Sequence, residues 1–331
     1  MCLNKTILLF LLLTFLPTAQ AYSFLGLGGR AEQKATIAAV REASSKGDYD
    51  TVIELSEEFF TRNINAPKRR LKRIYLLLGN AYKNRGDYDK ALLTYSEARE
   101  FYPKDIDLNL ALADIYVVGE LTDKAVEVYK NILKLDKDNN PAKLGLARAY
   151  LSEGLSIRAS DLFEEYINNK GETNGLVYYD YALSKFMAND YNKALSLAQE
   201  AASFGETADI IFLIAKIYKA QGEEKKAFDT IKLASQMDKT RNDILLLRGL
   251  WLAYDEDYQA EALEIANNYL KDKPQSQLAN FIKFLANKRA GDNTEASKNL
   301  KAITSSEGNG FTKQVALKLT ENKKNKKNKN N

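Results

Sequence analysis

Histidine is absent from this sequence of 331 residues, and Cys2 is its only cysteine. The chain therefore has no imidazole base, no Ser-His or Cys-His pair and no set of the usual zinc ligands. Carboxylates are present, but neighbours such as Glu57 and Glu58 point about 100° apart on a helix and should lie on solvated faces. We predict no catalytic residue, no cofactor and no metal ligand. An enzyme that acts on glycan through two convergent groove carboxylates is the less favoured alternative.

Proline is scarce as well, with five residues in the chain, and no long run alternates between polar and apolar residues. Both features favour helices over strands. The formal charge is +4, but setting aside Lys5 and the five lysines of residues 322–331 leaves a net charge of −2. A domain that binds nucleic acid would carry the basic field itself. We therefore expect an all-α protein that does not bind nucleic acid.

Residues 1–21 have the composition of a signal peptide. Lys5 supplies the positive charge, residues 7–16 are almost all apolar, and Ala19-Gln20-Ala21 is a small-residue cleavage site. The apolar run is shorter than the roughly 20 residues that a membrane span needs. We expect an exported protein, most simply periplasmic. A segment that stays uncleaved and anchors the chain to the membrane, and a secreted protein, are the alternatives.

A period of about 34 residues runs from Ala35 to Ile303. Within each period, apolar residues fall at helical spacing in two groups separated by a turn signal, which predicts two amphipathic helices. Further units start at or near Ile106, Asn140, Gly175, Ala208, Asn242 and Gln277, and a degenerate unit surrounds Gly47. The clearest unit covers residues 72–105 and carries the pattern at Tyr75, Leu78, Gly79, Tyr82, Ala91, Tyr95 and Ala98.

These residues resemble the tetratricopeptide repeat family, which has the same period. The resemblance implies a right-handed superhelical solenoid of about eight helix-turn-helix repeats. We assign residues 1–21 to the signal peptide, 22–34 to a flexible lead-in and 35–304 to the repeats. Residues 305–321 are expected to form a capping helix with Phe311, Val315 and Leu319 on its packing face, and 322–331 a disordered tail.

In this family the first helix of each repeat lines a concave groove, so the resemblance also implies the groove residues. They are polar and partly basic in the first half and mostly apolar in the second: Asn80, Lys83, Arg148, Tyr179, Phe186, Phe212, Lys216, Leu246 and Phe281. The family's carboxylate clamp is not supported, because its other positions hold Leu76, Ala111, Pro141 and Gly145. Eight tyrosines at repeat positions should pack in the core: Tyr75, Tyr82, Tyr88, Tyr95, Tyr116, Tyr129, Tyr150 and Tyr218.

We expect a non-enzymatic scaffold that binds a protein or peptide segment in this groove, in cell-envelope assembly, secretion or pilus-type machinery. The alternative is a structural subunit or assembly chaperone that docks through the repeat ends or the convex face. The tail lysines would allow weak contact with an anionic membrane surface. Tolerated drift in a segment that need not fold is the alternative for those lysines: Lys323, Lys324, Lys326, Lys327 and Lys329.

Overall fold

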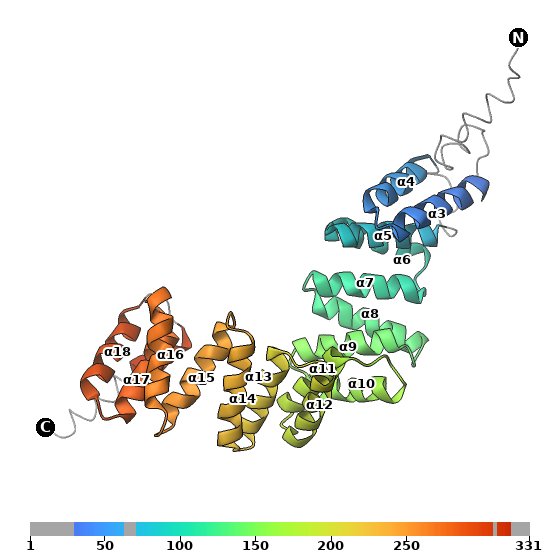
Figure 1. The fold of residues 1–331 in the computed structure, drawn as a ribbon. Coiled ribbons are helices and arrows are strands. Elements are labelled where there is room, and N and C mark those ends of the chain that lie inside the picture. Colours follow the sequence, from blue (N-terminus) through green and yellow to red (C-terminus); the bar gives the residue numbers. More distant parts are fainter. Residues whose placement is uncertain (1–29, 63–70, 307–309, 319–331) are drawn as a thin grey trace, which may run out of the picture. The chain divides into compact units, whose positions relative to one another are not determined.

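The structure, a computed structural model, describes residues 30–62, 71–306 and 310–318, and every regular element in these ranges is a helix (Figure 1). The chain divides after Glu172 into two compact units. The described part of the N-terminal unit consists of α3 (Arg30–Ser45), α4 (Tyr49–Arg62), α5 (Lys72–Arg85), α6 (Tyr88–Phe101), α7 (Ile106–Val118), α8 (Thr122–Leu135), α9 (Asn140–Ser152) and α10 (Ser156–Asn168).

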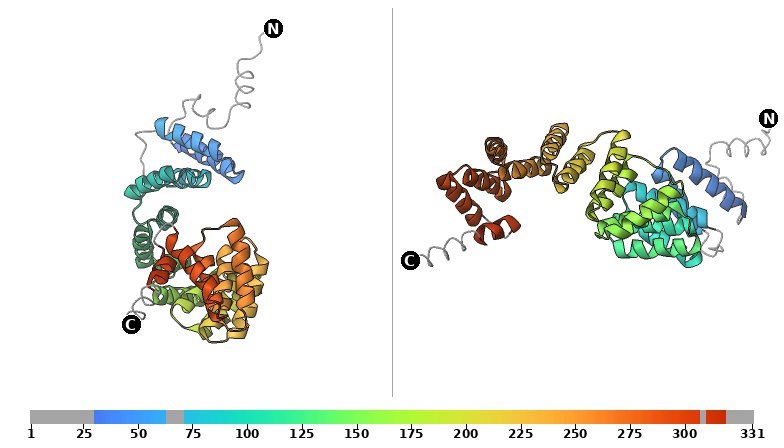
Figure 2. Two further views of the ribbon diagram at one scale, coloured as in Figure 1. Left: turned by 90° about the vertical axis from the view of Figure 1, so that its left-hand side faces the viewer. Right: turned by 90° about the horizontal axis from the view of Figure 1, so that it is seen from below.

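The C-terminal unit repeats the same arrangement of helix pairs. Its helices are α11 (Gly175–Met187), α12 (Tyr191–Ser203), α13 (Ala208–Ala220), α14 (Glu224–Met237), α15 (Asn242–Tyr254), α16 (Gln259–Asp272), α17 (Gln277–Arg289) and α18 (Asn293–Ser305). In both units each odd-numbered helix packs against the next even-numbered one as a hairpin (Figure 2). The described helices from α3 to α18 therefore form eight hairpins, in agreement with the number of repeats expected from the period.

The turn inside each hairpin recurs at a fixed place in the period. Gly86 ends α5 with a left-handed φ of 87°, and Glu120, one period later, takes the same region with a φ of 57°. A left-handed residue closes the last turn of a helix, but only glycine adopts it without steric strain. The glycines that recur in the sequence thus lie at hairpin turns. Some turns use another residue at the left-handed position, as Glu120 does.

Tyrosine rings pack over glycine where the helices approach closely. The Tyr95 ring lies against Gly79 and the Tyr129 ring against Gly145, at positions where a Cβ atom on either glycine would overlap the ring. Tyr95 is fully buried and Tyr129 nearly so. Five of the eight tyrosines expected in the core are buried as predicted: Tyr75, Tyr82, Tyr95, Tyr129 and Tyr150.

The other three repeat tyrosines differ from that expectation. Tyr88 is 45% exposed because it is the first residue of α6, beyond the packed part of the hairpin. Tyr116 and Tyr218 are half-buried. The ammonium groups of Lys124 and Lys226 lie 5.6 and 5.5 Å from the centres of these two rings. Because each lysine follows its tyrosine at the same spacing, the repeat covers the open side of these rings with a cation.

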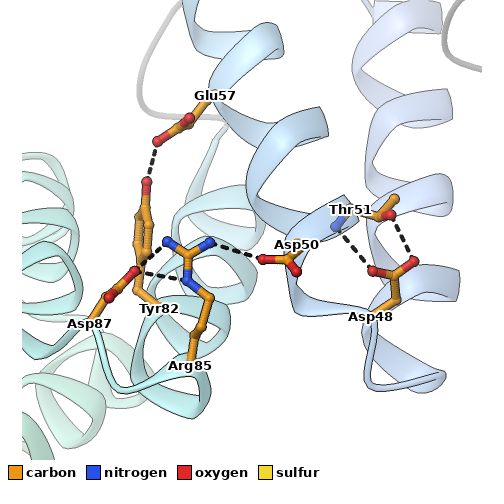
Figure 3. A network of polar contacts seen from close by, with 7 residues as sticks. All are labelled: Asp48, Asp50, Thr51, Glu57, Tyr82, Arg85 and Asp87. Carbon is orange, nitrogen blue, oxygen red and sulfur yellow. Dashed lines mark hydrogen bonds and ion pairs between the residues drawn. The ribbon is translucent and has the colours of Figure 1, made fainter.

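A polar network joins α4 to α5 (Figure 3). The Arg85 guanidinium contacts the Asp50 carboxylate at 2.9 Å and also the carboxylate of Asp87. The Tyr82 hydroxyl donates a hydrogen bond to the Glu57 carboxylate. The adjacent Glu58 pairs instead with an arginine of its own helix. The two glutamates diverge as helix geometry requires, and Glu57 is exposed as expected while its carboxylate accepts a hydrogen bond from the next hairpin.

The C-terminal hairpin α17–α18 is followed by a short helix over residues 311–318. Its packing face is not the predicted one: Phe311 is 80% exposed, whereas Ala316 is buried in a cluster with Phe284, Leu300 and Ile303. Phe311 is the first residue of the helix, and the small Ala316 side chain allows the helix to approach the cluster closely. Leu319 lies outside the described residues.

Three predicted segments fall largely or wholly outside the described residues. These are the signal peptide at 1–21, most of the lead-in at 22–34 and the tail at 322–331. Helix α3 begins at Arg30, so the backbone of residues 30–34 is already helical. Among the residues that the structure describes, no helix has the length and apolar character needed to cross a membrane.

Candidate functional site

The N-terminal unit contains a pocket of about 800 Å³ that spans three successive repeats. Its walls come mainly from α5, α7 and α9, which are the first helices of their hairpins. The structure brings the predicted Lys83 and Arg148 into this one pocket, together with Asp114. Asn80 does not line it.

A ladder of equivalent residues explains how the pocket wall is built. Asn80, Asp114 and Arg148 follow one another at intervals of one period and occupy the same place on α5, α7 and α9. The Tyr95 hydroxyl donates a 2.8 Å hydrogen bond to the Asn80 side-chain oxygen, and the Tyr129 hydroxyl donates one of 3.2 Å to the Asp114 carboxylate. In these two hairpins the second helix thus holds the polar side chain of the first.

The protonation of these tyrosines follows from their burial. Burial raises the pKa of Tyr95 and of Tyr129 above the usual value, and the nearby Asp114 carboxylate raises both further. Both hydroxyls therefore keep their protons at neutral pH and act as donors. The Tyr95 hydroxyl thus holds the Asn80 side chain in place.

The pocket combines charged and apolar surface. The Lys83 ammonium lies 3.7 Å from the Asp114 carboxylate, and with Arg148 the lining carries one net positive charge. Val117 and Val118, both about half exposed, supply apolar surface on the same wall. Such a recess offers ion pairing and hydrophobic contact to a ligand.

Tyr88 is a pocket residue that sequence reasoning missed. Its repeat position predicts core packing, whereas the structure leaves it 45% exposed in the pocket lining. The available signal was its place directly after the turn at Gly86-Asp87, where the first residue of a helix has few neighbours.

In the C-terminal unit three predicted groove residues meet. The Lys216 ammonium lies 4.7 Å from the centre of the Phe212 ring and 5.7 Å from the centre of the Phe186 ring. Phe186 comes from α11, and the other two residues come from α13. Burial lowers the pKa of Lys216, and neighbouring aspartates partly oppose that shift. Helices α11 and α13 thus form an aromatic site around one cation.

Tyr179 lines a separate recess of about 460 Å³ in the same unit. Leu176 and Phe204, both more than half exposed, contribute its apolar wall. Burial raises the pKa of Tyr179, and the Asp209 carboxylate raises it further. This recess lacks a lysine or arginine in its lining.

Leu246 is placed differently from the groove prediction, whereas Phe281 stays partly exposed. Leu246 is 7% exposed and belongs to a core cluster with Phe228 and Ile265. Phe281 is half-buried and stacks on Phe284, with ring centres 5.9 Å apart. Helix α15 packs against α17 directly as well as against α16, so side chains between these first helices are covered. Leu246 is therefore a core residue.

Metal chemistry has no visible site in the described part of the chain. No group of three or more histidine, cysteine, aspartate or glutamate side chains is placed to hold an ion there. The carboxylates near the two candidate sites are instead engaged with basic side chains, as Asp114 is with Lys83 and Asp209 with Arg241.

Comparisons with known proteins agree with the fold. A curated relative, tetratricopeptide repeat protein 8 of Caenorhabditis elegans, is 24% identical over 187 residues, which are 55% of this chain and 37% of that protein. The chain thus spans about a third of the length of this relative. A tetratricopeptide repeat protein from Parabacteroides merdae aligns with a TM-score of 0.53 at 16% identity, covering 87% of this chain and 98% of that one.

A second solved structure, of the APC/C hetero-tetramer Cut9–Hcn1, aligns with a TM-score of 0.52 at 13% identity. The alignment covers 90% of this chain and 58% of that one. The sequence model of the tetratricopeptide repeat family matches residues 72–115, which include α5 and most of α7. The period, the stacked hairpins and these matches agree on a fold of stacked tetratricopeptide repeats, which the family model recognises directly in residues 72–115.

Proposed function

We propose that the N-terminal unit binds a protein or peptide segment in the pocket formed by α5, α7 and α9. The observation that carries the proposal is the joining of three consecutive repeats in one recess of about 800 Å³. A recess of that extent accommodates several side chains of a ligand segment. The two cations at Lys83 and Arg148 favour a segment that carries an acidic group.

The mechanism is binding by a preformed surface. Asp114 is fixed by Tyr129 and Lys83, so this part of the wall loses little side-chain entropy when a ligand arrives. An acidic ligand group would pair with Arg148, and an apolar side chain would rest on Val117 and Val118. No bond is made or broken in this scheme, and we assign the protein no catalytic role. Tetratricopeptide repeat proteins are in general non-catalytic scaffolds, and a chain with this fold forms part of the Cut9–Hcn1 hetero-tetramer.

Photo-crosslinking tests the site directly. A photoreactive amino acid at Ser152 lies in the pocket lining, whereas one at the exposed Leu93 lies outside it and serves as the control. We expect a specific crosslinked partner from Ser152 alone, and its loss when Lys83→Ala and Arg148→Ala are combined. Crosslinks to the same partner from both positions, or crosslinks that persist in the double variant, would contradict the proposal. Circular dichroism checks that the double variant remains folded.

We further propose that the protein acts outside the cytoplasm, in envelope assembly, secretion or pilus-type machinery. The support is the signal-peptide pattern of residues 1–21, with Lys5, the apolar run at 7–16 and Ala21 at the cleavage site. Fusion of these residues to a reporter that is active only after export tests the proposal. We expect the reporter to be active and to lose its activity when Lys5 and the apolar run are replaced. A reporter that stays in the cytoplasm would refute the proposal.

A further inference from the structure

We propose that the C-terminal unit contains a second binding site, centred on Lys216, that takes a glutamate or aspartate side chain flanked by apolar residues in a peptide segment of another protein. The first argument is the position of the cation. Lys216 projects from α13 between the rings of Phe212 and Phe186, at 4.7 and 5.7 Å. Both side chains are only partly buried, and the Phe186 ring also packs against Tyr191, with ring centres 5.9 Å apart.

The second argument is that the protein itself leaves this charge without a carboxylate. Within the described ranges, no aspartate or glutamate forms an ion pair with the Lys216 ammonium. The nearest acids in electrostatic terms are Asp209 and Asp243. Both are engaged by Arg241, whose guanidinium lies 2.5 Å from Asp209 and 2.8 Å from Asp243. Arg241 therefore holds the acids that would otherwise compete for Lys216.

The third argument is the chemistry of a half-buried ammonium. Its charged form is disfavoured by burial, which lowers the Lys216 pKa, while the Asp209 and Asp243 carboxylates oppose that shift. An ammonium has three N–H donors, and a carboxylate accepts several hydrogen bonds. A ligand carboxylate would therefore complete the site, while apolar side chains on either side of it would cover the parts of Phe186 and Phe212 that remain exposed.

A neighbouring lysine supplies the contrast. Lys219 lies on the same helix and contacts the rings of Phe228 and Trp251, at 5.1 and 5.7 Å. It also pairs with Glu224. Lys219 thus resembles Lys216 in its aromatic contacts and differs in having its own carboxylate, which makes it the matched control.

Two short peptides test the proposal on the full chain: acetyl-Leu-Glu-Leu-amide and acetyl-Leu-Gln-Leu-amide, which differ only in the charge of the central residue. Side-chain NMR resonances of protein labelled with carbon-13 lysine report binding at Lys216. We expect the glutamate peptide to bind about fivefold to tenfold more tightly, as for one partly desolvated charged contact. The Lys216 pKa should rise on binding. Equal affinity for the two peptides, or no binding of either, would overturn the proposal.

Substitutions show whether the preference for the glutamate peptide depends on Lys216 or on another lysine or arginine. Lys216→Met should abolish the preference for glutamate, and Lys219→Met should keep it. Lys216→Gln provides a second neutral variant, and circular dichroism verifies the fold of each. A preference that survives both Lys216 variants would overturn the proposal. Lys83→Ala with Arg148→Ala should leave the preference intact, so failure at the N-terminal pocket and failure at Lys216 are distinguishable.

Discussion

Replacing Gly79 by alanine tests the close packing of α5 against α6. A Cβ atom at this position would lie 2.4 Å from Cε1 and 2.5 Å from Cζ of Tyr95. Real Cβ atoms essentially never approach a ring that closely, so the ring must move. Tyr95 is fully buried, and its hydroxyl is bonded to Asn80 at 2.8 Å. The ring therefore has no free space into which it can move.

The magnitude follows from three opposing effects. Overpacking a buried site costs about 1–3 kcal/mol. Displacing the Tyr95 hydroxyl from Asn80 loses a hydrogen bond that contributes about 1 kcal/mol. Alanine gains about 1 kcal/mol over glycine in a helix interior. The last two effects nearly cancel, and we expect Gly79→Ala to lower the free energy of unfolding by about 1–3 kcal/mol, the overpacking cost.

The assay is urea-induced unfolding, with amide hydrogen exchange in α5 and α6 to localise the loss, because repeat arrays need not unfold as one unit. The same substitution is then made in the Tyr95→Leu variant, because the smaller leucine side chain leaves room for the new methyl group. In that background Gly79→Ala should stabilise the protein by about 0.5–1 kcal/mol through helix propensity alone. A change of equal size and sign in both backgrounds would refute the packing argument.

Three further predictions concern the same unit. Gly86→Ala should lower the free energy of unfolding by about 1 kcal/mol, because Gly86 has a φ of 87°. Urea titration measures it, and an unchanged midpoint would contradict it. Arg85→Ala should lower the stability only slightly at low salt, since its ion pairs are exposed; a loss that does not shrink at high salt would argue against ion pairing. Finally, burial raises the pKa of Tyr95, so its contribution to stability is fully present below about pH 10 and is lost as the pH rises further. Unfolding followed against pH should show a shallower alkaline loss in Tyr95→Phe, and an identical slope would exclude that contribution.

The fold was predictable because the period places apolar and turn residues directly. Tyr75, Gly79 and Tyr95 lie where a hairpin core requires them, and the structure buries all three. The same reasoning brought Lys83 and Arg148 to one pocket, because residues at equivalent places on successive first helices share a face. The separation of the two compact units at Glu172 was not predicted, since the period continues through it.

The sequence pattern misplaces residues whose solvent exposure depends on the neighbouring helices rather than on their position in the repeat. Tyr88 has the repeat pattern of a core tyrosine, yet it begins a helix and is left at the rim. Leu246 has the position of a groove residue, but α17 approaches α15 and covers it. Phe311 is the largest apolar side chain of the last helix, yet the small Ala316 makes the contact. A single sequence does not specify the distances between helices that decide these cases.

The series of Asn80, Asp114 and Arg148 implies that each repeat sets the charge at this position separately. In the first two rungs an oxygen acceptor is matched by the hydroxyl of Tyr95 or Tyr129. In the third repeat Arg148 stands one period after Asp114. Phe163, which has no hydroxyl, stands one period after Tyr129. Each repeat thus pairs one position of its first helix with one position of its second helix. An amide or carboxylate is paired with tyrosine, and a guanidinium is paired with phenylalanine. Exchanging one such pair for another would change the charge at that repeat position while the helices that carry it stay the same.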